Sequence, residues 1–177
     1  MRKLKGSFAL VLALVLMLAA PGIVFAASIS FTDVSGHWAW TGGQIPYLVE
    51  KNVLNGYTQP DGTSLFKPDA TVKRSEFIKM LDETFGLTDT VEINYSDISD
   101  SDWYSVYFAK AAAQGYILDY GSKADPEGEI TREEAISLLV RYLDLPVSDK
   151  APSSTFSDYE SISSDYRQYI LMASAAG

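Results

Sequence analysis

The chain contains no cysteine and only one histidine among its 177 residues. The lack of cysteine excludes a disulfide framework and a thiolate metal site. The sequence also holds no H-E-x-x-H, G-x-S-x-G or P-loop pattern, so the common zinc, serine-nucleophile and phosphate-binding motifs are missing. We therefore predict a protein that is not an enzyme and that needs neither a metal nor a cofactor.

A long hydrophobic run is missing as well. The apolar stretch Phe8 to Ala20 has 13 residues, whereas a helix needs about 20 to cross a bilayer. Basic residues precede this stretch and small or β-branched residues follow it, namely Arg2, Lys3 and Lys5 before it and Val24 and Ala26 after it. This order is typical of a secretory signal peptide. We predict a signal peptide over residues 1–26 and a secreted mature chain starting near Ala27, with a transmembrane anchor as the alternative.

Positive charge is scarce. The chain has 14 Lys and Arg against 23 Asp and Glu, and leaving out the three basic residues of the signal peptide gives 11 against 23, a net charge of −12. Because an acidic surface repels phosphate groups, we expect no nucleic-acid partner and no membrane insertion after signal cleavage. The acidic group Asp97, Asp100 and Asp102 lacks the spacing of an EF-hand loop, which favours a solvated turn over a calcium site.

What the sequence does contain is an internal repeat. Phe31-Thr32-Asp33-Val34 recurs as Tyr95-Ser96-Asp97-Ile98 and as Phe156-Ser157-Asp158-Tyr159, at spacings of 64 and 61 residues. A second motif recurs at a constant offset of 58 residues, from Arg74, Glu76, Ile78 and Leu81 to Arg132, Glu134, Ile136 and Leu139. A fixed period of this kind marks a repeat architecture. We place repeat 1 at 27–87, repeat 2 at 92–146 and a partial repeat 3 at 153–177.

Each repeat is predicted to form a helix, a loop and a second helix. The apolar positions lie on one face of a helix, which predicts helices near 72–85, 103–114 and 132–143. Thr131 and Glu134 have the spacing of a capping box, and Thr71 is the expected cap of the first-copy helix. Asn52 and Gly115 suit the left-handed position after a helix. The first helix of repeat 1 should start near residues 43–45, with Pro46 in its first turn.

These ordered motifs resemble the S-layer homology family. Its pattern of F-x-D-V, W, G-Y, D-G-x-F-x-P and T-R-A-E-F is matched in repeat 1 by residues 31–34, Trp38, Gly56-Tyr57, Asp61-Gly62, Phe66-Lys67-Pro68 and Arg74-Ser75-Glu76-Phe77. The resemblance implies an all-α fold in which tandem helix-loop-helix repeats pack as a pseudo-threefold bundle, here with the third repeat incomplete. It also implies a non-catalytic module that anchors a protein to the cell wall.

In this family, grooves between repeats hold a secondary cell-wall polysaccharide that often carries a pyruvate ketal. The resemblance assigns the motif arginine to the groove, which corresponds to Arg74 and Arg132, and a guanidinium suits a ketal carboxylate. The further glycan-binding candidates are Trp38, Trp103, Gly56, Gly115, Asp33 and Asp97. The residues themselves leave alternatives open, because the tryptophans also suit a core or seam and the aspartates also suit turns and caps.

Two further interpretations follow from the same resemblance. The chain could be the N-terminal anchor fragment of a larger S-layer structural protein, with lattice subunits as partners through a C-terminal region outside it. It could equally be the anchor of a cell-surface enzyme whose functional domain lies beyond Gly177. In each case we expect a secreted protein attached to the cell wall or S-layer.

Overall fold

The computed structural model describes residues 30–117, 120–147 and 156–176. The predicted signal peptide, residues 1–26, lies outside the described residues. The chain divides after Ser30, and the fold described below belongs to the unit that begins at Phe31.

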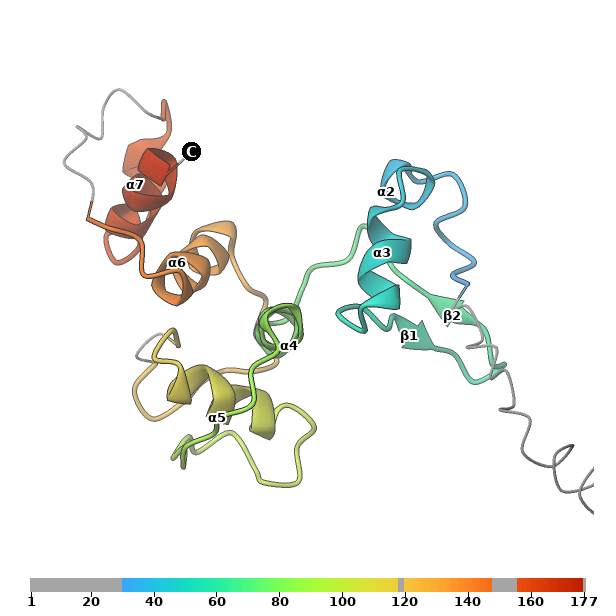
Figure 1. Ribbon diagram of the computed structural model, residues 1–177, viewed down its shortest axis with the longest axis horizontal. Helices are drawn as coiled ribbons and strands as arrows, with labels where there is room; N and C mark the ends of the chain where they lie inside the picture. The colour runs from blue at the N-terminus through green and yellow to red at the C-terminus, as the bar shows by residue number, and fades with distance from the viewer. Residues whose placement is uncertain (1–29, 118–119, 148–155, 177) are drawn as a thin grey trace, which may run out of the picture. The chain divides into compact units, whose positions relative to one another are not determined.

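Helices make up most of the regular structure (Figure 1). The elements of repeat 1 are α2 (Trp38–Thr41), α3 (Gln44–Glu50), β1 (Tyr57–Thr58), β2 (Ser64–Leu65) and α4 (Arg74–Phe85). Those that follow are α5 (Ser105–Ala113), α6 (Arg132–Tyr142), the 3-10 turn η2 (Tyr159–Ser161) and α7 (Arg167–Ala176). The strands β1 and β2 form a two-stranded antiparallel ribbon. The predicted helical class is therefore confirmed, while the pseudo-threefold arrangement stays a prediction.

The local signals in the sequence locate the helices well. The helices predicted at 72–85, 103–114 and 132–143 appear as α4, α5 and α6, each within two residues of the expected bounds. Pro46 is the third residue of α3, where its missing N–H removes no helical hydrogen bond. Asn52 and Gly115 have φ angles of 59° and 71°, so both adopt the expected left-handed conformation.

Each of the two motif helices forms one half of a capping box at its own N-terminus. In α6 the hydroxyl of Thr131 accepts from the amide of Glu134 at 3.2 Å. In α4 the carboxylate of Glu76 accepts from the amide of Lys73 at 3.0 Å, which is the reciprocal half of the box. The expected cap by Thr71 is wrong, because Lys73 occupies the N-cap and the Thr71 hydroxyl donates to Glu129 instead.

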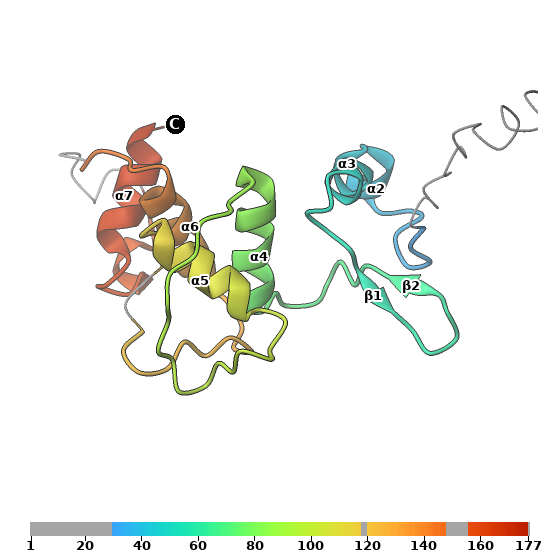
Figure 2. The same cartoon turned by 60° about the horizontal axis from the view of Figure 1, so that its bottom comes forward.

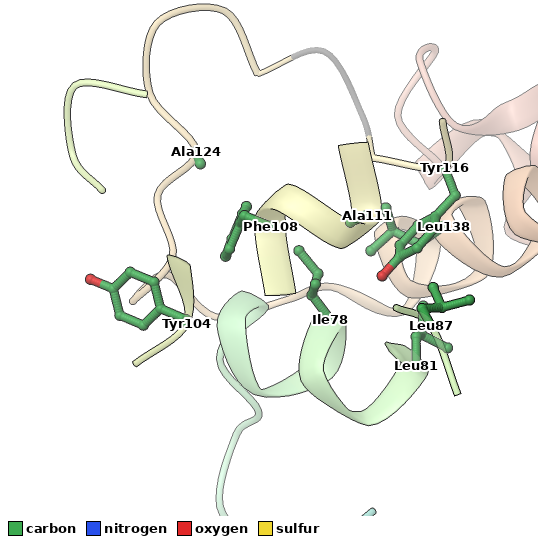
Figure 3. Packing of buried hydrophobic residues seen from close by; sticks show 9 residues of the cluster. All are labelled: Ile78, Leu81, Leu87, Tyr104, Phe108, Ala111, Tyr116, Ala124 and Leu138. Atoms are coloured by element: carbon green, nitrogen blue, oxygen red, sulfur yellow. The ribbon is translucent and has the colours of Figure 1, made fainter. Parts of the chain in front are cut away.

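Helices pair across the repeat boundaries. The second helix of repeat 1, α4, packs against α5 of repeat 2, and α6 packs against α7 of repeat 3 (Figures 1 and 2). In Figure 3, Ile78 of α4 and Phe108 of α5 lie close together, with the other buried side chains gathered beside them. The cluster consists of Ile78, Leu81, Leu87, Tyr104, Phe108, Ala111, Tyr116, Ala124 and Leu138. A separate small core, Phe31, Val34, Ala39 and Ile45, holds the first half of repeat 1.

Candidate functional site

Arg74, the first residue of α4, is inserted into repeat 2. Its side chain is only 12% exposed. Its Nε and Nη2 atoms donate to the two carboxylate oxygens of Glu134, and the Nη2 distance is 3.1 Å. Nη1 donates to the backbone carbonyls of Ala124 and Asp125, at 3.0 and 2.5 Å. The guanidinium also lies over the ring of Tyr120, 4.9 Å from its centroid. Arg74 therefore acts as a clamp between two repeats.

The groups that receive Arg74 form what we call the repeat 2 socket: Tyr120, Glu134 and the carbonyls of residues 124 and 125. The Tyr120 hydroxyl donates to Glu134 at 2.7 Å, and burial together with this carboxylate raises the tyrosine pKa. Asp97 fixes the loop, because its carboxylate accepts from the amides of Ala124 and Asp125 at 2.9 and 2.8 Å. All the parts of this socket come from one repeat.

Backbone bonds reinforce the clamp. The amide of Arg74 donates to the carbonyl of Gly128 at 2.8 Å, and the amide of Ser75 donates to Pro126 at 3.0 Å. These are two of the amides that a helix start leaves without an intrahelical partner. These two backbone amides at the start of α4 therefore bind repeat 2 and are not available to a ligand.

Repeat 1 contains the same set of groups, which we call the repeat 1 socket. The Tyr57 hydroxyl donates to Glu76 at 2.8 Å, and burial with this bond raises the tyrosine pKa to about 12. Asp33 accepts from the amides of Phe66 and Lys67 at 2.9 and 2.7 Å. Although burial alone raises the pKa of Asp33, these amide bonds bring it below its ordinary value, as their counterparts do for Asp97. Both aspartates thus hold loops in place.

A groove of about 590 Å³ opens beside the repeat 1 socket, and we call it the repeat 1 groove. Its apolar walls come from Val53, Leu54, Val72 and Met80, and repeat 2 contributes Trp103. Trp103 is 51% exposed and its ring rests edge-on against Tyr104 and Tyr107, with centroids 5.3 and 6.2 Å away. Of the predicted site residues, Trp103 and Gly56 line this groove.

Two lysines give the groove positive charge. Lys67 Nζ lies 4.3 Å from the centroid of the Tyr57 ring. Lys79 Nζ donates to the side-chain oxygen of Asn55 at 2.9 Å when that amide is oriented to face it. The carboxylate of Glu76 also lines the groove, but Tyr57 and the Lys73 amide already bind it. An aromatic face beside two ammonium groups suits a ligand that has both an apolar surface and negative charge.

The other predicted site residues lie elsewhere. Trp38 starts α2 and is 71% exposed, outside the groove lining. Arg132 starts α6 and is exposed, and within the described part of the chain its side chain makes no hydrogen bond or ion pair. Gly115 follows α5, and its carbonyl accepts from Arg141 at 3.0 Å. The glycan-binding roles proposed for all eight residues stay predictions.

Sequence reasoning missed Tyr57, Lys67 and Lys79 as site residues. A signal for the first was present, because Tyr57 recurs as Tyr120 at the same offset of 63 residues that relates Asn52 to Gly115. The lysines had no such signal, since repeat 2 has Asp125 where repeat 1 has Lys67. Within the described residues, no cluster of acidic or histidine side chains has the arrangement of a metal site, and no helix is both long and apolar enough to cross a membrane.

A sequence profile of the S-layer homology domain matches residues 30–78 and 94–136. Both segments fall inside the predicted repeats 1 and 2. The chain is 30% identical over 152 residues to the amylopullulanase of Thermoanaerobacterium thermosulfurigenes, an alignment that covers 84% of this chain and 8% of the relative. It is 30% identical over 143 residues to the S-layer protein of Bacillus thuringiensis subsp. finitimus, covering 78% of this chain and 17% of the relative.

The exoglucanase XynX of Acetivibrio thermocellus is 27% identical over 166 residues, which is 92% of this chain and 15% of the relative. The chain thus spans less than a fifth of the length of each of these three proteins. Two of these relatives are named as enzymes and one is named for the S-layer. The chain matches a short segment of each.

Proposed function

Because the chain belongs to the S-layer homology domain family, we propose that it is a non-catalytic attachment module of the cell envelope, binding a cell-wall polysaccharide in the repeat 1 groove. The shared segment occurs in enzymes and in S-layer proteins alike, which suits a role in attachment and not in one particular reaction. The activity of any protein that carries the module then resides in its other domains.

The observation that carries the proposal is the pairing of Trp103 with Lys67 and Lys79 in one groove. An exposed indole face packs against the apolar face of a sugar ring, and an ammonium binds a carboxylate in a charge-assisted hydrogen bond. A local excess of cations on a chain with a net charge of −9 is a specific feature. We propose a glycan with carboxylate groups, such as pyruvate ketals on amino sugars, as the ligand.

The motif arginines enter the proposal in different ways. To bind the glycan, the guanidinium of Arg74 would first have to release the carboxylate of Glu134. Its proposed role is therefore structural: it holds Trp103 of repeat 2 against repeat 1. The Arg132 side chain is exposed, and it has no hydrogen-bond partner among the residues that the structure describes. It is therefore the arginine through which the predicted contact with a carboxylate can be tested without disturbing the fold.

The test is calorimetric titration of the full chain with purified cell-wall polysaccharide, before and after removal of its ketal carboxylates by mild acid. Lys79→Ala should weaken binding about tenfold or more, since a hydrogen bond to a charged group contributes about 1.5–3 kcal/mol. Trp103→Ala should weaken binding by a similar factor, because it removes the aromatic face on which the sugar ring packs. Trp38→Ala is the matched control, because it removes an exposed indole outside the groove and should leave binding within about twofold.

Removal of the ketal carboxylates should abolish the difference between the parent protein and Lys79→Ala. An equal loss for Trp38→Ala and Trp103→Ala, or binding that ignores the carboxylates, would contradict the groove as the site. Arg132→Ala should weaken binding about tenfold if the predicted arginine contact exists. Unchanged binding would assign Arg132 to the solvated surface.

A further inference from the structure

Asn55 and Gly56 form an Asn-Gly pair in the lining of the repeat 1 groove. An asparagine that precedes glycine can lose its side-chain nitrogen as ammonia, because no side chain hinders attack by the glycine nitrogen. We propose that Asn55 is a site of spontaneous deamidation, and that the carboxylate formed there weakens the binding of a carboxylate-bearing ligand. The second half of this proposal rests on the proposed function, and the first half does not.

The reaction needs only water as a partner. The backbone nitrogen of Gly56 attacks Cγ of Asn55 and loses its proton to solvent. The Cγ–Nδ2 bond breaks, and Nδ2 takes up a proton and leaves as ammonia. Water then opens the resulting succinimide ring, which gives aspartate by addition at Cγ or isoaspartate by addition at the backbone carbonyl carbon. Either product is ionised at neutral pH and carries a negative charge that Asn55 lacks.

The structure leaves the attacking nitrogen accessible. Asn55 and Gly56 are both exposed, and neither belongs to a helix or a strand. Within the described residues, the amide of Gly56 donates no hydrogen bond. Asn52 differs in both respects, because the residue after it is the buried Val53, whose amide donates to the carbonyl of Leu48 at 2.9 Å. Asn52 is therefore a built-in comparison three residues away.

Lys79 of α4 favours the attack on Asn55. In the amide orientation that gives both ends of the side chain a partner, the Asn55 oxygen accepts from Lys79 Nζ at 2.9 Å. The attack converts this oxygen into an oxyanion. An ammonium at hydrogen-bonding distance stabilises the oxyanion more strongly than it stabilises the neutral amide, which lowers the barrier.

The fold itself requires glycine after Asn55. Gly56 has a φ angle of 65°, and an added Cβ would clash with the ring of Phe31 and the carbonyl oxygen of Leu65. A larger residue would slow ring closure, but it would also displace this loop. The chain contains no other Asn-Gly pair. The packing of repeat 1 thus maintains the one residue type that makes Asn55 labile.

The new charge would lie among the cations that the groove offers to a ligand. The charged side chains of the lining are Lys67, Lys79 and Glu76, a net charge of +1. A carboxylate at residue 55 lowers this net charge to zero and forms an ion pair with the Lys79 ammonium. The groove then loses most of its attraction for an anionic ligand. Isoaspartate also lengthens the backbone before Gly56, where the chain is tightly packed.

The first test measures the reaction in the full chain. After incubation at neutral and at mildly alkaline pH, tandem mass spectrometry of the tryptic peptide that holds both Asn52 and Asn55 locates the change from amide to acid. The change should occur at Asn55, and faster at the higher pH because the Gly56 nitrogen must lose a proton. Lys79→Met should slow it about tenfold, as expected when a transition state loses one stabilising contact.

Asn55→Gln is the resistant control, since glutamine would have to close a less favourable six-membered ring. Conversion at Asn55 no faster than at Asn52 would overturn the proposal. An unchanged rate in Lys79→Met would overturn the role of Lys79.

The second test measures the consequence by calorimetric titration with the cell-wall polysaccharide. Fresh Asn55→Asp and the converted parent should each bind about tenfold more weakly than the fresh parent. Asn55→Gln should keep its initial affinity through the same incubation. Equal affinities of the fresh parent and fresh Asn55→Asp would overturn the second half of the proposal alone. No binding by the fresh parent would overturn the proposed function together with that half, and the mass measurement would still decide deamidation at Asn55.

Discussion

Arg74 and Arg132 begin equivalent helices 58 residues apart, yet their surroundings differ. Arg74 is 12% exposed and binds a carboxylate, two carbonyls and an aromatic ring. Arg132 is exposed at the start of α6. The motif alone therefore does not show where its arginine lies, because within the described residues Arg74 meets a socket in the next repeat and Arg132 does not.

The motif glutamates show the same dependence. Glu134 faces the preceding repeat through Arg74 and is 2% exposed, whereas Glu76 binds the start of its own helix. One residue type at one repeat position thus serves as an inter-repeat partner in one copy and as a helix cap in the other. The comparison predicts that equal substitutions in the two repeats will have unequal effects.

The largest effect is expected for the arginines. Arg74→Ala leaves the Glu134 carboxylate buried without its cation, which should lower the free energy of unfolding by about 3–5 kcal/mol. Arg132→Ala removes an exposed side chain and should change it by about 0.5 kcal/mol or less. Urea denaturation followed by circular dichroism measures both values. Similar losses for the two variants would break the distinction between a clamped and a free arginine.

A second difference between the repeats concerns Asp82, which is 1% exposed on α4 and corresponds to Val140 of α6. Burial raises the pKa of Asp82 from 3.8 to about 6, although the Tyr116 hydroxyl donates to it at 2.7 Å. Since the folded state favours the protonated acid, this group costs stability as the pH rises from about 4 to about 6. A shift of about two pKa units corresponds to about 3 kcal/mol.

Asp82→Asn removes the titration, so the difference in unfolding free energy between parent and variant should change by about 3 kcal/mol between pH 4 and pH 7. The parent should lose stability relative to the variant as the pH rises. Taking this difference cancels the opposite contribution of Asp33 and Asp97, whose lowered pKa values favour the folded state at higher pH. A pH-independent difference would mean that folding does not raise the pKa of Asp82.

The smallest expected effect compares two glycines with positive φ angles. At Gly56 an added Cβ would lie 2.2 Å from Cε1 of Phe31 and 2.6 Å from the carbonyl oxygen of Leu65. At Gly115 it would meet nothing within 4 Å. Gly115→Ala should therefore cost about 1 kcal/mol from left-handed strain alone, and Gly56→Ala should cost about 2 kcal/mol more from the clash. Thermal unfolding of both variants checks this order. Equal costs would mean that left-handed strain is the sole cause of the destabilisation.

The sequence predicted the helices because their signals are local. The apolar spacing of Ile78 and Leu81 and the turn residues after each helix act within a few positions. The constant offset between repeats then supported each helix with a second copy. The cap of α4 was the exception, since the residue that satisfies the Lys73 amide, Glu76, lies inside the helix.

The site could be predicted only in part because its contacts are long-range. Arg74 was correctly selected, but its partner Glu134 lies 60 residues away in the next repeat, and no local pattern shows that these two side chains meet. Trp38 and Trp103 were equivalent as sequence motifs. Only packing distinguishes them, because Trp103 rests on Tyr104 and Tyr107 beside repeat 1 while the ring of Trp38 contacts His37.

The pairing of helices across repeats means that the duplicated segment and the cooperative folding unit are offset by half a repeat. A cut between residues 87 and 92, at the predicted seam, would separate Ile78 and Leu81 of α4 from Phe108 of α5. A cut in the loop between Phe66 and Arg74 would instead pass between the two hydrophobic clusters. Recombination that shuffles these modules, and truncation in the laboratory, should therefore tolerate breakpoints within a repeat better than breakpoints at its ends.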